Sequence, residues 1–473
     1  MKTSEYVPHP YQERVIDRGV RDARLGKLLD PGLGKTSITL EVFRRLRAQF
    51  EVSRLLVVAP LRVAYSVWPH EAQKWAQFRE LRVHVLHGDG LHPHWLEQDA
   101  ADVLVINPEG LEWLAHQRRA RLPEMIAVDE STKFKRTSAK RSRILKHLLK
   151  RIPHRRYILT GTPAPNGLGD LHGQVRILDD GAALGDTLKE FRERFCSYVP
   201  NGTPYGGVWE VRTSARAEIL RLVEPLVIRL DARDYLDLPE LVRVDVPVRL
   251  PPAAAELYAR LRHDLVVQFE AGAVVATNAG ALSGKLRQVA SGSVYLTPDG
   301  AVSEAPTRRW EVIHDEKARA LVDLFEELGG KPLLIAFEFE HEREVIRRAL
   351  KPIAGEVPVI AGGVSAKRGA ELERLWNAGR LPVLLVHPAA AAHGLNLQAG
   401  GHHIAFYTSP WDLELYDQLI GRLYRQGQQE DRVFVHHLVA QGTIDERVSA
   451  VLRRKGRDQG DLLEALRLAA LAT

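Results

Sequence analysis

Cysteine is almost absent from this sequence, since Cys196 is the only one in 473 residues. A single thiol excludes an internal disulfide framework and any zinc site made of cysteines alone, and it is typical of a protein from a reducing compartment. We interpret Cys196 as an ordinary buried or half-buried residue rather than a catalytic thiol.

Long apolar runs and targeting signals are missing as well. The longest apolar stretch, VLLVHPAAAA, is too short and too interrupted to cross a bilayer. The N-terminal residues MKTSEYVPHPYQERVID lack the apolar centre of a secretory signal, and no heptad run or short repeat is present. We therefore expect a soluble, cytoplasmic protein with no membrane partner.

The charge balance is slightly basic. Lys and Arg together number 66 against 60 Asp and Glu, which gives a formal net charge of +6. This excess permits a polyanionic partner without specifying one. A hydrophobic content of 45% is ordinary for a globular protein, and the length suffices for two or three domains with cores of their own.

Short β-branched runs alternate with segments of helical periodicity. The first half contains RLLVVAP, DVLVINP, MIAVDE and RRYILTGTP, and the second half contains KPLLIAF, VPVI, LPVLLVHP, HHIAFYT and RVFVHHLV. Such alternation predicts parallel sheets covered by helices on both faces. Because the alternation fades between about residues 178 and 243, we predict two tandem α/β domains, residues 1–230 and 231–473, the second ending in C-terminal helices.

The stretch LLDPGLGKTS is close to the phosphate-loop pattern G-x-x-x-x-G-K-[ST], although the first glycine of that pattern falls on Leu29. Gly32 and Gly34 would leave backbone N–H groups free for phosphate, Lys35 would supply a cation, and Thr36 a hydroxyl for Mg²⁺. A predicted strand precedes the loop and a predicted helix follows it. By itself, so short a motif is also compatible with a simple helix N-cap turn.

An acidic pair, Asp129 and Glu130, ends the predicted strand MIAV. A carboxylate at the tip of a neighbouring parallel strand can orient Mg²⁺, while the next one positions an attacking water. An isolated acidic pair is often just a helix cap. The apolar strand before this pair and the phosphate loop upstream favour the catalytic interpretation.

At this point the chain resembles the Swi/Snf-related ATPases of helicase superfamily two over nearly its whole length. The motifs occur in the family's order. They are PYQERVI, the loop similar to D-E-M-G-L-G-K-T, LLVVAPLRVAYSVWPHEAQKW, VLVINPEGL, VDESTKFK, YILTGTPAPNGLGDLHGQ, LLIAFEFEHERE, AAAAHGLNLQAGGHHIAFYTSPWD and DQLIGRLYRQGQ. The family's loop also lacks the early glycine.

The resemblance implies two RecA-like P-loop domains with ATP and Mg²⁺ in the cleft between them. The implied nucleotide-binding residues are Gln12, Pro31, Gly32, Leu33, Gly34, Lys35, Thr36, Ser37 and Gly394. Gln12 would contact the base, Thr36 and Asp129 would hold the metal, and Glu130 would activate water. Arg422 and Arg425 would reach the γ-phosphate from the second domain, with Arg425 as the arginine finger.

We expect both arginines to lie on a helix that begins near Trp411, with Gln418 as a coupling residue one turn before Arg422. The resemblance also implies double-stranded DNA as the partner, followed along its phosphate backbone. The candidate DNA contacts are Arg62, Thr160, Gly161, Thr162, Asn166, Asn396 and Trp411. The basic segment 133–156 is either part of the DNA groove or a solvated helix face.

The sequence departs from the family's usual residues at a few places. Pro31 stands in place of methionine, Ser131 and Thr132 in place of alanine and histidine, and Leu413 in place of proline. None of these changes removes a charge needed for hydrolysis. Zinc modules and reader segments are not evident, so we expect a compact, monomeric motor of bacterial or phage type that works with replication, repair or recombination proteins.

Three hypotheses follow, with an ATP-driven translocase on double-stranded DNA as the leading one. A strand-separating helicase on branched DNA or RNA is the second, and it would need a wedge from residues 196–212 or 272–292. The third is a nucleotide-switched DNA-binding module without relevant turnover. That module would tolerate loss of Lys35, Glu130 or Arg425, and all three are present.

Overall fold

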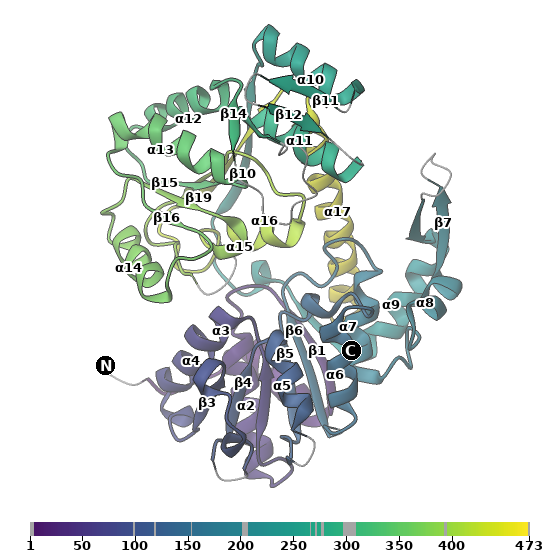
Figure 1. Ribbon diagram of the computed structural model, residues 1–473. Coiled ribbons are helices and arrows are strands. Elements are labelled where there is room, and N and C mark those ends of the chain that lie inside the picture. The colour runs from purple at the N-terminus through teal and green to yellow at the C-terminus, as the bar shows by residue number, and fades with distance from the viewer. Residues whose placement is uncertain are drawn as a thin grey trace. The chain divides into compact units, whose positions relative to one another are not determined.

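The computed structural model describes residues 4–97, 100–117, 120–152, 154–200, 207–264, 266–269, 272–275, 279–296, 309–391 and 395–471. The chain forms two compact units (Figure 1). Unit 1 comprises Met1–Asp237 with Lys455–Thr473, and unit 2 comprises Leu238–Arg454. The domain division at residue 230 stays a prediction. Unit 1 continues to Asp237 and also includes the C-terminal residues from Lys455 onward.

Unit 1 contains a seven-stranded parallel sheet in the order β3-β4-β2-β5-β6-β1-β9. Its strands are β1 (Arg24–Leu29), β2 (Leu55–Val58), β3 (Val83–Leu86), β4 (Val103–Ile106), β5 (Met125–Asp129), β6 (Arg155–Thr160) and β9 (Val227–Leu230). The strands β2, β4, β5 and β6 are buried along their whole length. The strands β2 and β4 are accordingly continuous apolar runs, whereas β5 ends in Asp129 and β6 begins with Arg155 and Arg156.

Two of these strands are absent from the sequence prediction. The edge strand β3 is only half-buried for most of its length and carries His84. The other edge strand, β9, carries Arg229 and lies where the strand–helix alternation fades. Polar residues within short strands hide both from a periodicity analysis.

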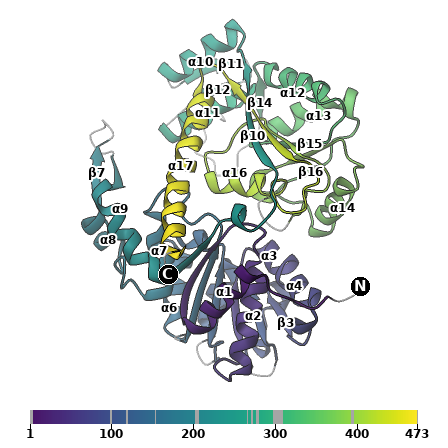
Figure 2. The ribbon, with the colours of Figure 1, turned by 180° about the vertical axis from the view of Figure 1, so that it is seen from behind.

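The helices of unit 1 are α1 (Pro10–Arg21), α2 (Lys35–Ala48), α3 (Leu61–Ser66), α4 (Trp68–Lys74), α5 (Leu111–His116), α6 (Lys140–Leu149), α7 (Asp170–Asp179), α8 (Leu188–Phe195) and α9 (Arg216–Val223). Leu114 of α5 and Leu148 of α6 join the core on one sheet face with Leu56 and Ile126. Figure 2 shows α1 and α2 side by side. An antiparallel hairpin, β7 (Cys196–Pro200) and β8 (Gly207–Val211), extends from the region of α8 and α9 in Figure 1.

Unit 2 contains a six-stranded parallel sheet in the order β10-β19-β18-β15-β17-β16. Its strands are β10 (Glu240–Val248), β15 (Leu333–Ala336), β16 (Val359–Ile360), β17 (Val383–Val386), β18 (His403–Phe406) and β19 (Arg432–Ala440). Adjacent residues of β15 enter different cores, with Leu333 and Ile335 in one and Leu334 and Ala336 in the other. Both faces of this sheet are therefore covered.

The helices of unit 2 are α10 (Pro252–Asp264), α11 (Ala279–Ser291), α12 (Glu316–Glu327), α13 (Glu340–Ala354), α14 (Ala366–Asn377), α15 (Pro388–Ala391) and α16 (Leu413–Ile420), and α17 (Ile444–Leu471) begins there. Two small hairpins complete the unit, β11 (Val266–Phe269) with β12 (Gly272–Val275), and β13 (Ser293–Tyr295) with β14 (Trp310–Val312). Within the described ranges, no helix has the length and apolar character needed to cross a membrane.

Candidate nucleotide site

Four loops meet at one edge of the unit 1 sheet. Strands β5, β6, β1 and β9 are consecutive neighbours and run in parallel, so their carboxyl ends lie on the same side. This edge is the position at which parallel α/β sheets bind ligands. It brings together the phosphate loop after β1, the acidic pair after β5, the T-G-T loop after β6 and the segment after β9.

The phosphate loop needs its two glycines. Gly32 has φ 92° and Gly34 has φ 83°, both in the left-handed region that side chains disfavour. A Cβ atom on Gly34 would also lie 2.5 Å from Nε2 of Gln12. Leu29 is the last residue of β1 and fully buried, so the loop starts after the point where the strict pattern has its first glycine.

The Lys35 ammonium group lies against the end of β1. Its Nζ atom donates to the carbonyl oxygens of Leu29 at 2.7 Å and Asp30 at 3.3 Å. Burial lowers the pKa of Lys35, while the carboxylates of Glu130 and Asp129 act in the opposite direction. The structure thus brings the predicted cation and both predicted acids into one electrostatic neighbourhood.

Asp129 is buried, and each of its carboxylate oxygens accepts a hydrogen bond. Its Oδ2 accepts a hydrogen bond from Nε1 of Trp68 at 3.0 Å, and its Oδ1 accepts one from the backbone N–H of Glu130 at 3.1 Å. Burial raises the pKa of Asp129, and the Trp68 and Lys35 contacts oppose that rise. Trp68 is not among the predicted site residues, although its place in the motif LLVVAPLRVAYSVWPHEAQKW is the signal that points to it.

Glu130 adopts a left-handed backbone conformation, with φ 52° and ψ 57°. This is uncommon for a residue other than glycine, and such strain concentrates at functional sites. The next residue, Ser131, donates through Oγ to Oε1 of Gln174 at 2.7 Å, and Nε2 of Gln174 donates to the carbonyl of Pro163 at 2.6 Å. Ser131 therefore links the acidic turn to the T-G-T-P loop.

That loop packs on the phosphate loop. A Cβ on Gly161 would lie 3.2 Å from Cδ of Pro31. Thr160 and Thr162 are buried, and Oγ1 of Thr160 accepts from the backbone N–H of Thr162 at 3.1 Å. Their side chains therefore support the loop rather than reach out toward a partner.

The other predicted contacts of unit 1 are more peripheral. Asn166 is exposed, and its side chain binds Oδ2 of Asp170 at 3.1 Å and Nζ of Lys455 at 2.8 Å. Arg62 is half-buried in the first turn of α3. Gln12 is buried on α1, where its Nε2 donates to the carbonyl of Leu33 at 3.3 Å and so supports the phosphate loop.

The remaining residues of the phosphate loop differ in exposure. Thr36 is half-buried at the start of α2, and Oγ of Ser37 donates to the carbonyl of Gly34 at 3.1 Å. Pro31 is exposed and Leu33 is buried. The roles of all these residues in nucleotide binding stay predictions.

In unit 2, the helix expected to carry both arginines ends too early. Helix α16 stops at Ile420, and Gly421 is its C-cap, so Arg422 and Arg425 lie in the following turn. The prediction of a shared helix face is wrong. After Ile420 the N–H groups of Arg422 and Leu423 bond to the carbonyls of Leu419 and Ile420, three residues earlier, as in a 3₁₀ turn rather than an α-helix.

We call residues 421–427 the arginine turn, and its two arginines are bound to nearby oxygens. Arg422 donates to the carbonyls of Leu395 at 3.0 Å and Gln418 at 3.1 Å. Arg425 Nη1 donates to Oδ1 of Asn396 at 2.5 Å. Asn396 and Arg425, both predicted site residues, are therefore direct neighbours.

Three further predicted residues belong to unit 2. Gln418 is buried on α16, where its Nε2 donates to Oε1 of Glu414 at 3.3 Å. Trp411 is half-buried and packs against the core of unit 2. Gly394 lies outside the described residues.

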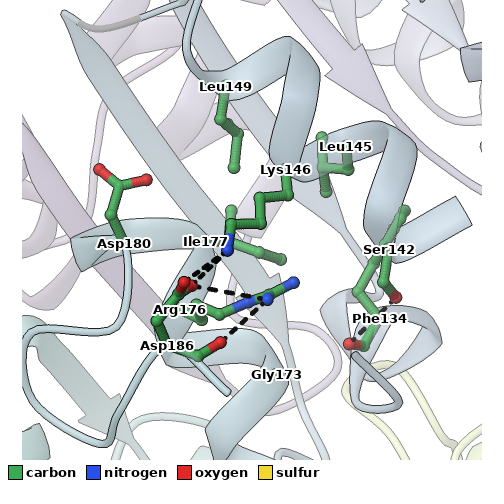
Figure 3. A pocket seen from close by; sticks show the side chains of 10 residues that line it. All are labelled: Phe134, Ser142, Leu145, Lys146, Leu149, Gly173, Arg176, Ile177, Asp180 and Asp186. Atoms are coloured by element: carbon green, nitrogen blue, oxygen red, sulfur yellow. Dashed lines mark hydrogen bonds and ion pairs between the residues drawn. The ribbon is translucent and has the colours of Figure 1, made fainter. Parts of the chain in front are cut away.

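The basic segment 133–156 uses much of its charge within unit 1. Lys140 pairs with Glu112 at 2.7 Å, and Arg156 pairs with Asp180 at 2.7 Å. Figure 3 shows a small hollow in which Lys146 and Arg176 both point toward Asp186, with Lys146 Nζ 2.6 Å from each carboxylate oxygen. The hollow has about 10 Å³ of free volume, which is room for about one water molecule.

Comparisons with known proteins identify the family. The SNF2-related domain family matches residues 23–292, and the helicase conserved C-terminal domain matches residues 316–427. The chain is 34% identical to "Putative protein p41" of Acyrthosiphon pisum secondary endosymbiont phage 1, over 99% of this chain and 100% of that protein.

Longer relatives match over part of their length. The chain is 25% identical to the putative ATP-dependent helicase/translocase YwqA of Bacillus subtilis (strain 168), over 92% of this chain and 46% of that protein. It is 26% identical to the DNA annealing helicase and endonuclease ZRANB3 of Mus musculus, over 94% and 39%. The chain thus spans the whole phage protein but less than half of these two.

A solved structure is similar as well, the Sulfolobus solfataricus SWI2/SNF2 ATPase core in complex with dsDNA. Its TM-score is 0.43 at 22% identity, and the match covers 98% of this chain and 97% of that one. The family matches and the two parallel sheets together identify the fold as two tandem RecA-like domains.

Proposed function

The chain belongs to the SNF2-related family of ATPases, and from that membership we propose that it couples ATP hydrolysis to movement along double-stranded DNA. The protein is an ATP hydrolase of the SNF2 helicase family. The observation that carries the proposal is the grouping of Lys35, Asp129 and Glu130 at the carboxyl edge of the unit 1 sheet.

The residues at this edge fit Mg²⁺-ATP. Gly32 and Gly34 form a loop that a Cβ would strain or obstruct, which leaves the N–H groups at the start of α2 available to phosphate oxygens. Thr36 and Asp129 offer the hard oxygen ligands that Mg²⁺ prefers, and the ion would neutralise phosphate charge there. Gln12 would contact the base.

Hydrolysis would use the two acids and a cation from unit 2. We assign Glu130 to orient the attacking water and Lys35 to hold the terminal phosphates. Arg425, with Arg422 beside it, would stabilise the charge that develops on the transferred phosphoryl group. The hydrogen-bonded path from Ser131 through Gln174 to Pro163 supports coupling between the acidic turn and the T-G-T-P loop.

The DNA contacts belong to the same proposal. We assign them to Arg62, Asn166, Asn396 and Trp411 and to the backbone of residues 160–162, whose side chains are largely buried or absent. Contacts of this kind bind the phosphate backbone without reading sequence. We further propose that the motor acts inside the cell as a monomer, with replication, repair or recombination proteins as partners.

The decisive experiment compares ATP hydrolysis stimulated by duplex DNA, single-stranded DNA, branched DNA and RNA. We expect duplex DNA to stimulate most and the protein to displace a third strand from a triplex without separating the duplex. Stimulation by RNA alone, or stimulation without triplex displacement, would overturn the translocase proposal.

The hairpin β7–β8 favours strand separation as a second candidate function. Tyr198 and Trp209 pair across the hairpin with ring centroids 5.5 Å apart, and their exposed fractions are 49% and 44%. The guanidinium of Arg192 lies 5.5 Å from the Trp209 ring. Exposed aromatic side chains of this kind can stack on unpaired bases.

This alternative makes a separate prediction. Trp209→Ser should abolish unwinding of a forked DNA while leaving duplex-stimulated ATP hydrolysis intact, and Glu210→Gln on the adjacent position is the control. Equal unwinding by wild type and Trp209→Ser would exclude the hairpin as a wedge.

A further inference from the structure

Residues 229–236, near the end of the first segment of unit 1, contact the phosphate loop directly. We call this segment the connector. It begins on the edge strand β9, which pairs with β1, and continues as a short turn that packs back on unit 1. The connector contacts the phosphate loop at two points and helix α1 at two more.

The first contact is an ion pair. Arg229 is only 4% exposed, and its Nη1 lies 2.6 Å from Oδ1 of Asp30 and 3.1 Å from the carbonyl oxygen of Leu28. The second carboxylate oxygen of Asp30 accepts the backbone N–H of Ala232 at 3.0 Å. The backbone N–H of Asp30 donates to the carbonyl of Leu230 at 3.3 Å. Asp30, the first residue of the phosphate loop, is thus bound to the connector through both its carboxylate and its backbone.

The remaining contacts are apolar or aromatic. Cδ1 of Leu236 would lie 3.2 Å from a Cβ on Gly32, so the leucine side chain packs beside this glycine of the loop. The Tyr235 ring lies 4.7 Å from the Tyr11 ring, and its hydroxyl accepts from Nη2 of Arg14 at 2.7 Å. Tyr11 precedes the predicted base contact Gln12 on α1. The connector therefore touches both the phosphate side and the base side of the candidate site.

We propose that the connector is a positioning element for nucleotide binding, with Arg229 and Asp30 as its positioning residues. This inference rests on the proposed function, because it concerns the same phosphate loop. A loop that offers backbone N–H groups to phosphate binds well only if its backbone is already fixed, since ordering it on binding costs affinity. Asp30 fixes one end of the loop, and Leu236 supports the middle.

The connector also has a consequence along the chain. The first segment of unit 1 ends at Asp237, and β10, the edge strand of the unit 2 sheet, begins at Glu240. A change in the phosphate loop that shifts Asp30 or Gly32 would act on the chain immediately before it enters unit 2. The connector therefore contacts the phosphate loop and leads, within a few residues, into the edge strand of the second sheet.

Binding of ADP tests the positioning role without requiring turnover. Asp30→Asn keeps the shape of the side chain but removes its negative charge. Leu236→Ala removes the side chain that packs beside Gly32. By calorimetry we expect ADP to bind about tenfold more weakly to Asp30→Asn and about threefold more weakly to Leu236→Ala. Arg233→Ala is the matched control, because Arg233 pairs with Asp231 at 2.6 Å within the same turn and is 70% exposed.

Wild-type affinity for ADP in both variants would overturn the proposal. If Asp30→Asn unfolds, as judged by its thermal melt, Leu236→Ala decides by itself. The proposed function fails separately, if the wild-type protein binds ADP but shows no DNA-stimulated hydrolysis.

Amide hydrogen exchange provides a second readout. We expect ADP to slow exchange at Ala232 and Leu236, whose N–H groups bond to Asp30 and to the Ala232 carbonyl, together with residues 30–36. Protection of residues 30–36 without any change in the connector would show that the two do not respond together, and would overturn the proposal.

Discussion

The phosphate loop of unit 1 and the arginine turn of unit 2 both carry proposed catalytic cations, but they are supported differently. The phosphate loop is fixed by Gln12, Arg229 and the glycine backbone in addition to the two carbonyl bonds of Lys35. In the arginine turn, Arg422 and Arg425 are themselves among the supports, through Leu395, Gln418 and Asn396. The phosphate loop thus has supports that do not involve its catalytic cation, so catalytic and structural roles are more separable in unit 1 than in unit 2.

The largest expected effect tests this separation in unit 1. Lys35→Ala should abolish DNA-stimulated ATP hydrolysis and leave the fold intact, because the loop loses the two bonds of Lys35 but keeps its contacts with Gln12 and Arg229. A steady-state phosphate-release assay and a melt measure the two quantities. Unchanged turnover would remove Lys35 from the site.

The next effect concerns the arginine turn. Arg425→Ala should lower hydrolysis by on the order of a thousandfold while sparing ATP binding, as for arginine fingers in general. Single-turnover hydrolysis and equilibrium binding of ATP separate the two steps. If ATP affinity collapses and the rate of the bound enzyme does not, the finger assignment is wrong.

Arg422→Ala should lower both the stability of the protein and the rate of ATP hydrolysis. Its two hydrogen bonds to carbonyl groups hold the turn, and removing a charged donor costs about 2 kcal/mol of stability. We expect a lower thermal midpoint together with slower hydrolysis. A variant that melts like the wild type would show that the turn does not depend on Arg422.

A smaller effect is expected at Trp68. Trp68→Phe keeps the buried ring but removes the hydrogen bond from Nε1 to Asp129. Residues that orient a metal ligand are usually worth about tenfold in activity or metal affinity, so we expect the Mg²⁺ requirement to rise by about that factor. Titrating hydrolysis with Mg²⁺ measures it, and a curve identical to wild type would make Trp68 a packing residue alone.

The smallest expected effect concerns a second lysine of unit 1, Lys27. Lys27 is fully buried in β1, and burial lowers its pKa to about 7 from an ordinary value of 10.5. Between these two values the unfolded chain holds a proton that the folded chain does not, so stability should rise as the pH rises from 7 to 9. Lys27→Met should remove this rise and gain about 1 kcal/mol at pH 7, net of the lost bond to Thr39. Urea unfolding of both proteins at pH 7 and pH 9 measures the change in unfolding free energy. The same rise with pH in Lys27→Met as in the wild type would contradict the assignment of this rise to Lys27.

The parts that sequence reasoning predicted are local in the chain. The phosphate loop lies between a strand and a helix within about twenty residues, and Asp129 follows a buried apolar strand, so pattern and spacing suffice for both. The parts that it missed depend on distant residues. In the sequence, Arg229 is an arginine in a region without clear strand or helix periodicity. Only the fold shows that it pairs with Asp30.

The end of α16 was mispredicted for a different reason. The sequence after Ile420 keeps the spacing of a helix, yet Arg422 bonds to carbonyls of Leu395 and Gln418 rather than extending along a helix face. Leu395 lies in another loop of unit 2, and no local pattern predicts that contact. Tertiary partners override helical spacing here.

The placement of β9 beside β1 has a consequence for biosynthesis. Arg229 bonds to Leu28, a residue 201 positions earlier in the chain, and β1 pairs with β9 along most of its length. While the chain is being made, β1 therefore keeps one unpaired edge until nearly half of the protein has been synthesised. Pairings this distant form slowly and leave strand edges open to other chains. A nascent or truncated chain that stops before β9 would then need a chaperone, or its own helices, to shield the strand that leads into the phosphate loop.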